Sequence, residues 1–136
     1  ELFGGCIDVL EFMKGTDFFF FFYFWNGKIL FFETSEEKPS VDNVRRMLRN
    51  YGMQGIFNRI SGILFARARD YSEKEKEELE TMIQDVVGGE FGKTDLPIMA
   101  NLDFGHTDPQ IVLPLGVKVK IDCTAVTLEL AEPWLE

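Results

Sequence analysis

Two titratable side chains follow apolar runs of the sequence, and their types suit acid–base chemistry. Glu33 comes directly after the run KILFF (28–32), and His106, the only histidine, lies in a polar loop (101–110) after the run LPIMA (96–100). An imidazole can act as a general base near neutral pH, and a carboxylate can fix its tautomer and stabilise its imidazolium form. Glu33 and His106 are therefore the candidate catalytic pair. The alternatives are a histidine on the surface and a histidine with a purely structural partner.

The same loop contains few side chains that could bind a metal ion. Asp103 and Asp108 flank His106, but no second histidine or nearby cysteine completes a typical site. Cys6 and Cys123 lie near opposite ends of the chain without Cys-x-x-Cys spacing, which indicates neither a disulfide framework nor a zinc cluster. We therefore expect no metal, no cofactor and a reduced, cytoplasmic setting.

The elements that must position Glu33 and His106 alternate between apolar runs and amphipathic segments. The predicted buried strands are 28–33, 60–65 and 96–100. The predicted helices are 7–13, ended by Gly15, 41–51, between Ser40 and Gly52, and 73–87, between Ser72 and Gly88-Gly89. Alternating apolar and polar residues at 117–121 and 126–130 predict an antiparallel pair. The order predicts an α/β fold with a mostly parallel core sheet and an antiparallel C-terminal β extension, in which both residues stand at the carboxyl ends of strands.

Composition limits the partners of the chain. Its 136 residues, 46% of them hydrophobic, predict one folded domain over residues 1–136. The net charge of −9 disfavours nucleic acid, and the arginines between 45 and 69 alternate with apolar residues in the manner of a solvated face. No apolar run reaches the roughly 18–20 residues of a membrane span, and no basic-then-apolar signal peptide opens the chain. We expect neither a nucleic-acid nor a membrane partner.

Eight consecutive aromatic residues, Phe18–Trp25, stand out from this composition. In an extended strand alternate side chains point to opposite faces, so about half of them would meet solvent, another chain or a missing domain. An exposed apolar patch marks an interface or an aggregation hazard. We predict a homo-oligomer formed through Phe18–Trp25; the alternative is that the domain itself covers both faces.

Several longer segments carry a family resemblance. They are Gly4-Gly5-Cys6, Gly15-Thr16, GKILFFETSEE (27–37), VRRMLRNYGMQGIFNRISGILF (44–65) and NLDFGHTDPQIVLPLGV (101–117). In this order they resemble the LD-carboxypeptidase family of serine peptidases. That family includes murein tetrapeptide carboxypeptidases and the microcin C immunity peptidases.

The resemblance implies a two-domain enzyme with a Ser-Glu-His triad. The glutamate of such a triad ends a strand in a pattern like LFxE[DT], which falls on Glu33, and the histidine lies in a pattern like GHTxP, which falls on His106. The nucleophilic serine belongs to the N-terminal domain. The chain thus resembles the C-terminal domain alone, which has a swivelling β/β/α fold in this family.

No segment resembles the nucleophile elbow of the family. The pattern predicts that Ser40 and Ser72 cap helices, that Ser61 starts a strand and that Ser35 lies in a loop. Without the nucleophile we expect no peptidase activity from this chain by itself.

The sequence also departs from the family pattern. Residues 18–25 leave it almost completely, Ala66 stands where glycine is more usual, and Thr34 follows the glutamate in place of Asp. Glu36 and Glu37 fit the immunity-peptidase branch better than the murein branch. The substrate is left open between a murein tetrapeptide and a peptidyl-nucleotide.

Overall fold

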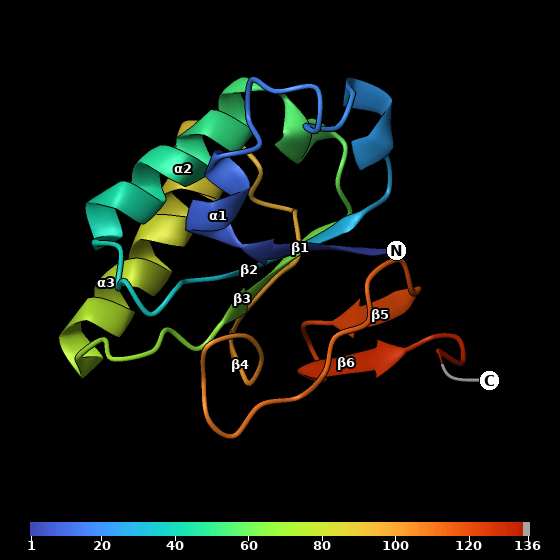
Figure 1. The fold of residues 1–136 in the computed structure, drawn as a ribbon. Coiled ribbons are helices and arrows are strands. Elements are labelled where there is room, and N and C mark those ends of the chain that lie inside the picture. The colour runs from blue at the N-terminus through green and yellow to red at the C-terminus, as the bar shows by residue number, and fades with distance from the viewer. Residues whose placement is uncertain (135–136) are drawn as a thin grey trace.

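A parallel four-stranded sheet forms the centre of the molecule (Figure 1). The computed structural model describes residues 1–134. The strands follow one another across the sheet in chain order: β1 (Leu2–Cys6), β2 (Ile29–Glu33), β3 (Gly62–Ala66) and β4 (Ile98–Leu102). A separate antiparallel pair is formed by β5 (Val119–Asp122) and β6 (Thr127–Leu130). The predicted parallel core with an antiparallel C-terminal extension is confirmed.

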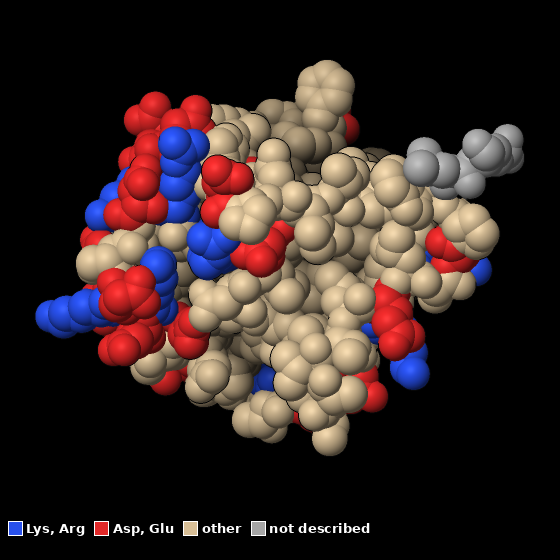
Figure 2. All heavy atoms as spheres, turned by 90° about the horizontal axis from the view of Figure 1, so that it is seen from below, with Lys and Arg blue, Asp and Glu red and all other residues tan. Residues whose placement is uncertain are grey.

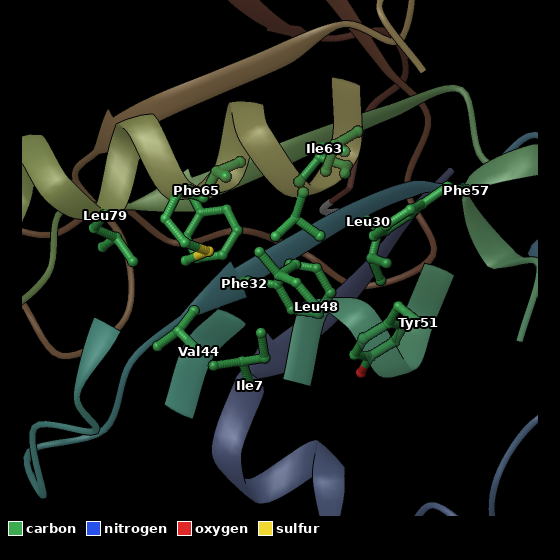
Figure 3. Packing of buried hydrophobic residues seen from close by; sticks show 14 of the residues in the cluster. Ile7, Leu30, Phe32, Val44, Leu48, Tyr51, Phe57, Ile63, Phe65 and Leu79 are labelled. Atoms are coloured by element: carbon green, nitrogen blue, oxygen red, sulfur yellow. The ribbon is translucent and has the colours of Figure 1, made fainter. Parts of the chain in front are cut away.

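Helices cover one face of the parallel sheet (Figure 1). They are α1 (Ile7–Glu11), α2 (Val41–Met53) and α3 (Glu73–Gln84). Alternate residues of β2 and β3, such as Phe32 and Ile63, point into a core shared with Leu48 and Tyr51 of α2 (Figure 3). Ser40 and Ser72 cap α2 and α3 as predicted, and Ser72 forms a capping box with Glu75. Within residues 1–134 we find no helix with the length and apolar character needed to cross a membrane.

The opposite face of the sheet is covered by the loop after β4 and by the β5–β6 pair (Figure 1). Phe31 and Leu64 contribute to a second apolar cluster, which Phe104 of the loop and Ile121 of β5 complete. Seen from this side, charged side chains gather toward α3, and the rest of the surface is largely uncharged (Figure 2). Because both faces are covered, every residue of β2 and β3 is buried, which explains their continuous apolar sequence.

One strand of the parallel sheet was not predicted from the sequence. Residues Leu2–Cys6 form β1, which pairs in parallel with β2, and Cys6 lies opposite Glu33. The segment contains Gly4 and Gly5, which have low strand propensity, so its extended form depends on the backbone partners that β2 provides. The helix expected from 7 to 13 is correspondingly short and ends at Glu11.

Two glycine signals for helix ends were wrong. Gly52 lies inside α2, where a Cβ atom would overlap the ring of Phe91, so its small size permits close packing. Beyond α3 the chain continues as a π-helical segment (Asp85–Glu90) through Gly88 and Gly89. All three glycines were interpreted as local stop signals, the usual role of glycine after a helix, but here they lie inside helical segments.

The aromatic run is not a strand. It forms turns and then a single 3-10 turn (Phe22–Trp25). Trp25 is buried and Phe19, Phe20 and Phe24 are half-buried against the helix-side core, whereas the other four side chains are exposed. The guanidinium group of Arg59 lies 3.2 Å from the centre of the Phe22 ring. The strand geometry was wrong, but the expectation that about half of these rings are not covered by the domain is confirmed.

Candidate active site

The candidate site lies at the carboxyl edge of the parallel sheet. Glu33 is the last residue of β2, and His106 follows the end of β4 by four positions. Since β3 separates these two strands, the loop after β4 must pass over the end of β3 to bring His106 to Glu33. The backbone N–H of Arg67, just after β3, donates to the carbonyl of Leu102 and extends the β3–β4 pairing. The Arg67 side chain contacts the loop beyond it, at Asp103 and Asp108.

His106 and Glu33 are joined by two hydrogen bonds. The Oε2 atom of Glu33 lies 2.7 Å from Nδ1 of His106 and also accepts from the backbone N–H of His106 at 2.7 Å. With Nδ1 as the donor, the neutral ring carries its proton on Nδ1, and Nε2 is the unprotonated nitrogen. The Glu33 side chain is nearly buried and the His106 side chain is 38% exposed. The structure therefore brings together the two residues that the sequence singled out.

Three contacts hold the histidine loop in place. Phe104 is buried and its ring meets that of Phe31 edge-on at 5.6 Å. Arg67 donates to Oδ1 of Asp103 through Nε (3.0 Å) and a terminal nitrogen (2.8 Å), and to the carbonyl of Asp108 (3.2 Å). Arg67 thus fastens both ends of the segment that carries His106. It was expected to belong to a solvated face. Its side chain is 34% exposed and also binds this loop.

Gly105 permits the close approach of this loop to Glu33. Its φ is +76°, in the left-handed region that favours glycine. A Cβ atom built on Gly105 would overlap the carboxylate of Glu33. Both the backbone conformation and the available space therefore require glycine next to His106.

Asp103 and Asp108, the two acids considered as metal ligands, do not converge on His106. Oδ1 of Asp103 is engaged by Arg67, and Asp108 contributes its backbone carbonyl to the same guanidinium. Among residues 1–134, no cluster of three or more histidine, cysteine or acidic side chains has a geometry that could hold a metal ion.

The Nε2 atom of His106 also has a partner. Oε2 of Glu36, an exposed residue three positions after Glu33, lies 2.8 Å from it. The imidazole therefore stands between two carboxylates. The hydrogen bond that His106 donates to Glu33 raises the pKa of His106, and burial opposes this shift. The charges of Glu33 and Glu36 raise the pKa further, against the opposing charge of Arg69.

Asp8 at the start of α1 fixes the turn that carries Glu36. It accepts hydrogen bonds from the hydroxyl and the backbone N–H of Ser35 and from the thiol of Cys6. Burial alone would raise the pKa of Asp8, but the hydrogen bonds from Cys6 and Ser35 outweigh it and leave the pKa lowered. Burial and the bond to Asp8 raise the pKa of the Cys6 thiol to about 12, so this thiol is a poor nucleophile.

The serines of the chain are engaged elsewhere. Ser35 donates to Asp8, Ser40 and Ser72 cap helices, and Ser61 lies at the amino end of β3, away from the edge that carries His106. Within residues 1–134, the recorded contact of Nε2 is to Glu36 and not to a serine hydroxyl.

Sequence reasoning missed four residues that shape this site: Asp8, Glu36, Arg67 and Gly105. Glu36 and Gly105 stood within recognisable motifs, three positions after the glutamate and one before the histidine. Asp8 and Arg67 carried no signal of their own, because their contacts join segments that are distant in the sequence.

The fold and the site define a class of domain: a parallel α/β domain that presents a carboxylate–imidazole pair at the carboxyl edge of its sheet. Residues 1–121 match the family model for the LD-carboxypeptidase C-terminal domain. The chain belongs to this family.

Named relatives are similar to nearly the whole chain. The microcin C7 self-immunity protein MccF of Escherichia coli is 27% identical over 112 residues, which are 81% of this chain and 30% of that protein. The crystal structure of an MccF-like protein from Streptococcus pneumoniae in complex with AMP has a TM-score of 0.81 at 28% identity, covering 96% of this chain and 40% of that one. A muramoyltetrapeptide carboxypeptidase from Oxalobacter formigenes shares the fold, with a TM-score of 0.70 at 22% identity, over 93% of this chain and 42% of that one.

The chain spans about a third of the length of the curated relatives that it matches.

Proposed function

We propose that this chain supplies the glutamate and the histidine of a serine-type LD-carboxypeptidase, with the nucleophilic serine on another domain of the parent protein. The observation that carries the proposal is the 2.7 Å contact between Oε2 of Glu33 and Nδ1 of His106. In such a triad His106 takes the proton of the attacking hydroxyl through Nε2, and Glu33 holds the ring and stabilises the imidazolium.

The proposal includes the inactivity of the chain by itself. Acyl transfer needs an attacking group and an oxyanion site. Among residues 1–134, Ser40 and Ser72 cap helices, Ser35 is bound to Asp8, and Ser61 lies at the amino end of β3, away from His106. The substrate class is an amide next to a D-amino acid or the amide of a peptidyl-nucleotide. A nucleotide substrate draws support from the MccF-like relative, which was crystallised with AMP.

Hydrolysis assays of the isolated chain and of the full-length parent test this function. We expect no turnover of an L,D-tetrapeptide or a peptidyl-adenylate analogue by the isolated chain, and turnover of one of them by the parent. In the parent, His106→Ala and Glu33→Gln are expected to lower kcat by about 10²- to 10⁴-fold, whereas Ser61→Ala serves as a matched control. Turnover by the isolated chain that His106→Ala abolishes, or a parent that tolerates His106→Ala, would overturn the proposal.

A second class of function, self-association, is favoured by the aromatic run. Phe18 is 80% exposed and Phe21 is 87% exposed, next to the exposed Tyr23. Aromatic rings gathered on one surface are typical of protein interfaces. We propose a second copy of this chain as the partner, and the Discussion gives the test.

The remaining parts of the proposal concern domain and setting. The parallel sheet has apolar clusters on both faces, and the β5–β6 pair packs on one of them, which supports one domain over residues 1–136. Two free cysteines are compatible with a reduced, cytoplasmic setting. Arginines paired with acids, as in Arg49 with Glu90, support a protein without a nucleic-acid partner.

A further inference from the structure

The Nε2 atom of His106, which the proposed function reserves for the hydroxyl of the nucleophile, lies against a carboxylate of the same chain. Oε2 of Glu36 lies 2.8 Å from it. We propose that Glu36 is a self-blocking residue, which holds Nε2 in this chain and must rotate away before His106 can accept a proton from a nucleophile. This inference rests on the proposed function and deepens it, because it concerns the regulation of the same site.

The turn that carries Glu36 is held without the help of the Glu36 carboxylate. The backbone N–H of Lys38 donates to the carbonyl of Ser35 at 3.2 Å, which closes a tight turn around Glu36 and Glu37. The Ser35 hydroxyl accepts from the N–H of Glu37 at 3.3 Å and is itself bound to Asp8. The turn therefore keeps its shape when the Glu36 side chain moves.

Release of the block requires only a side-chain rotation. The side chain of Glu36 is 61% exposed, and its recorded partner among residues 1–134 is His106. Exposed side chains change rotamer within nanoseconds. The contact can thus be lost quickly when a hydroxyl from another domain competes for Nε2.

The charges around His106 determine the strength of the contact between Glu36 and Nε2. Glu33 faces the ring from the end of β2, Glu36 from the turn after it, and Arg69 from the segment after β3. A cavity of about 740 Å³ beside the ring is also lined by the charged side chains Arg67, Asp70, Lys76 and Asp108. Two carboxylates on the two ring nitrogens favour the imidazolium, which cannot act as a base. Departure of Glu36 therefore frees Nε2 and also favours the neutral form of the ring.

The single histidine of the chain makes this inference directly measurable. The pKa of His106 follows from a ¹⁵N NMR titration of the 136-residue chain. The accessibility of neutral Nε2 follows from the rate at which diethyl pyrocarbonate modifies His106, read by the mass of the peptide that contains it. The variants are Glu36→Ala, the matched neighbour Glu37→Ala in the same turn, and Glu33→Gln.

We expect Glu36→Ala to lower the pKa of His106 and to speed its modification by roughly a factor of two to five, the range that an exposed ion pair supports. Glu37→Ala is expected to change neither quantity. An unchanged pKa and rate in Glu36→Ala, or equal effects of Glu36→Ala and Glu37→Ala, would overturn the inference.

The Glu33→Gln variant separates this inference from the proposed function. If Glu33→Gln lowers the pKa and Glu36→Ala does not, the Glu33–His106 pair stands and the block is refuted. If Glu33→Gln leaves the pKa unchanged, the pair that carries the proposed function is itself refuted, whatever Glu36→Ala does.

Discussion

One oxygen atom of Glu33 accepts both the backbone N–H and Nδ1 of His106, each at 2.7 Å. The two bonds constrain different parts of the histidine, because the first fixes the loop and the second fixes the ring. The two residues are separated by 73 positions in the sequence. Their contact depends on Gly105, on the hydrogen bonds of Arg67 to the loop and on the buried ring of Phe104. The site should therefore respond to changes in each of these residues.

Gly105→Ala tests whether the close approach of the histidine loop to Glu33 maintains the pair. The new Cβ would overlap the Glu33 carboxylate, so we expect the loop to shift and the pKa of His106 to fall toward its ordinary value. The backbone strain adds a loss of about 1–3 kcal/mol in the free energy of unfolding. NMR titration and chemical denaturation measure the two effects.

Gly116→Ala is the matched control for Gly105→Ala. Gly116 also has a positive φ, +78°, but a Cβ atom there meets nothing within 4 Å. We expect a similar loss of stability and no change in the pKa of His106. If both variants changed the pKa equally, the steric role of Gly105 would be refuted.

The stability of the domain should depend on pH through His106. Hydrogen bonding to Glu33 raises the pKa of His106 above the value of about 6.5 for an unfolded chain. The extra stability of the protonated form is therefore complete below about pH 6.5 and is lost as the pH rises through the folded pKa. Because 38% of the side chain is exposed, solvent screening limits this contribution to less than about 1 kcal/mol.

Urea denaturation of the wild type and of His106→Asn between pH 5.5 and 9 would measure this dependence. We expect the stability difference between the two proteins to shrink as the pH rises, and Glu33→Gln to remove the trend. A difference that grows with pH would contradict the assigned direction of the pKa shift.

The aromatic run should divide into structural and surface positions. Trp25 is 2% exposed and packs edge-on against Phe3, Phe24 and Tyr51, so Trp25→Ala is expected to cost about 3–5 kcal/mol in the free energy of unfolding. Phe21, at 87% exposure, should tolerate Phe21→Ala within about 0.5 kcal/mol. Equal losses in chemical denaturation would show that the exposed half of the run also supports the fold.

The same run should govern association between copies of the chain. We expect an oligomer at micromolar concentration in light scattering, and a shift toward monomer in the double variant Phe18→Ser/Phe21→Ser. Phe12→Ser is the control, since Phe12 is also 80% exposed but lies outside the run. A wild-type chain that is monomeric at this concentration would refute self-association.

Local patterns were sufficient for the elements whose own residues provide the signal. Continuous apolar runs predicted β2 and β3, and Ser40 and Ser72 predicted the starts of α2 and α3. The run at 96–100 predicted a buried strand, but β4 spans Ile98–Leu102 and is mostly half-buried. A whole strand and the end of one helix were not predicted, because both depend on distant partners. β1 contains Gly4 and Gly5 and becomes a strand through pairing with β2, and α2 continues through Gly52 because that glycine accommodates the Phe91 ring.

The sequence by itself determined the chemistry of the site: one histidine, one glutamate at a strand end, and no free nucleophile elbow. Only the tertiary structure decided how these groups meet. The crossing of the loop over β3 brings His106 to Glu33, and the turn fixed by Asp8 places Glu36 on Nε2. Residue types set which proton transfers a site can perform, but the partner of each ring nitrogen depends on distances that form only when remote segments pack together.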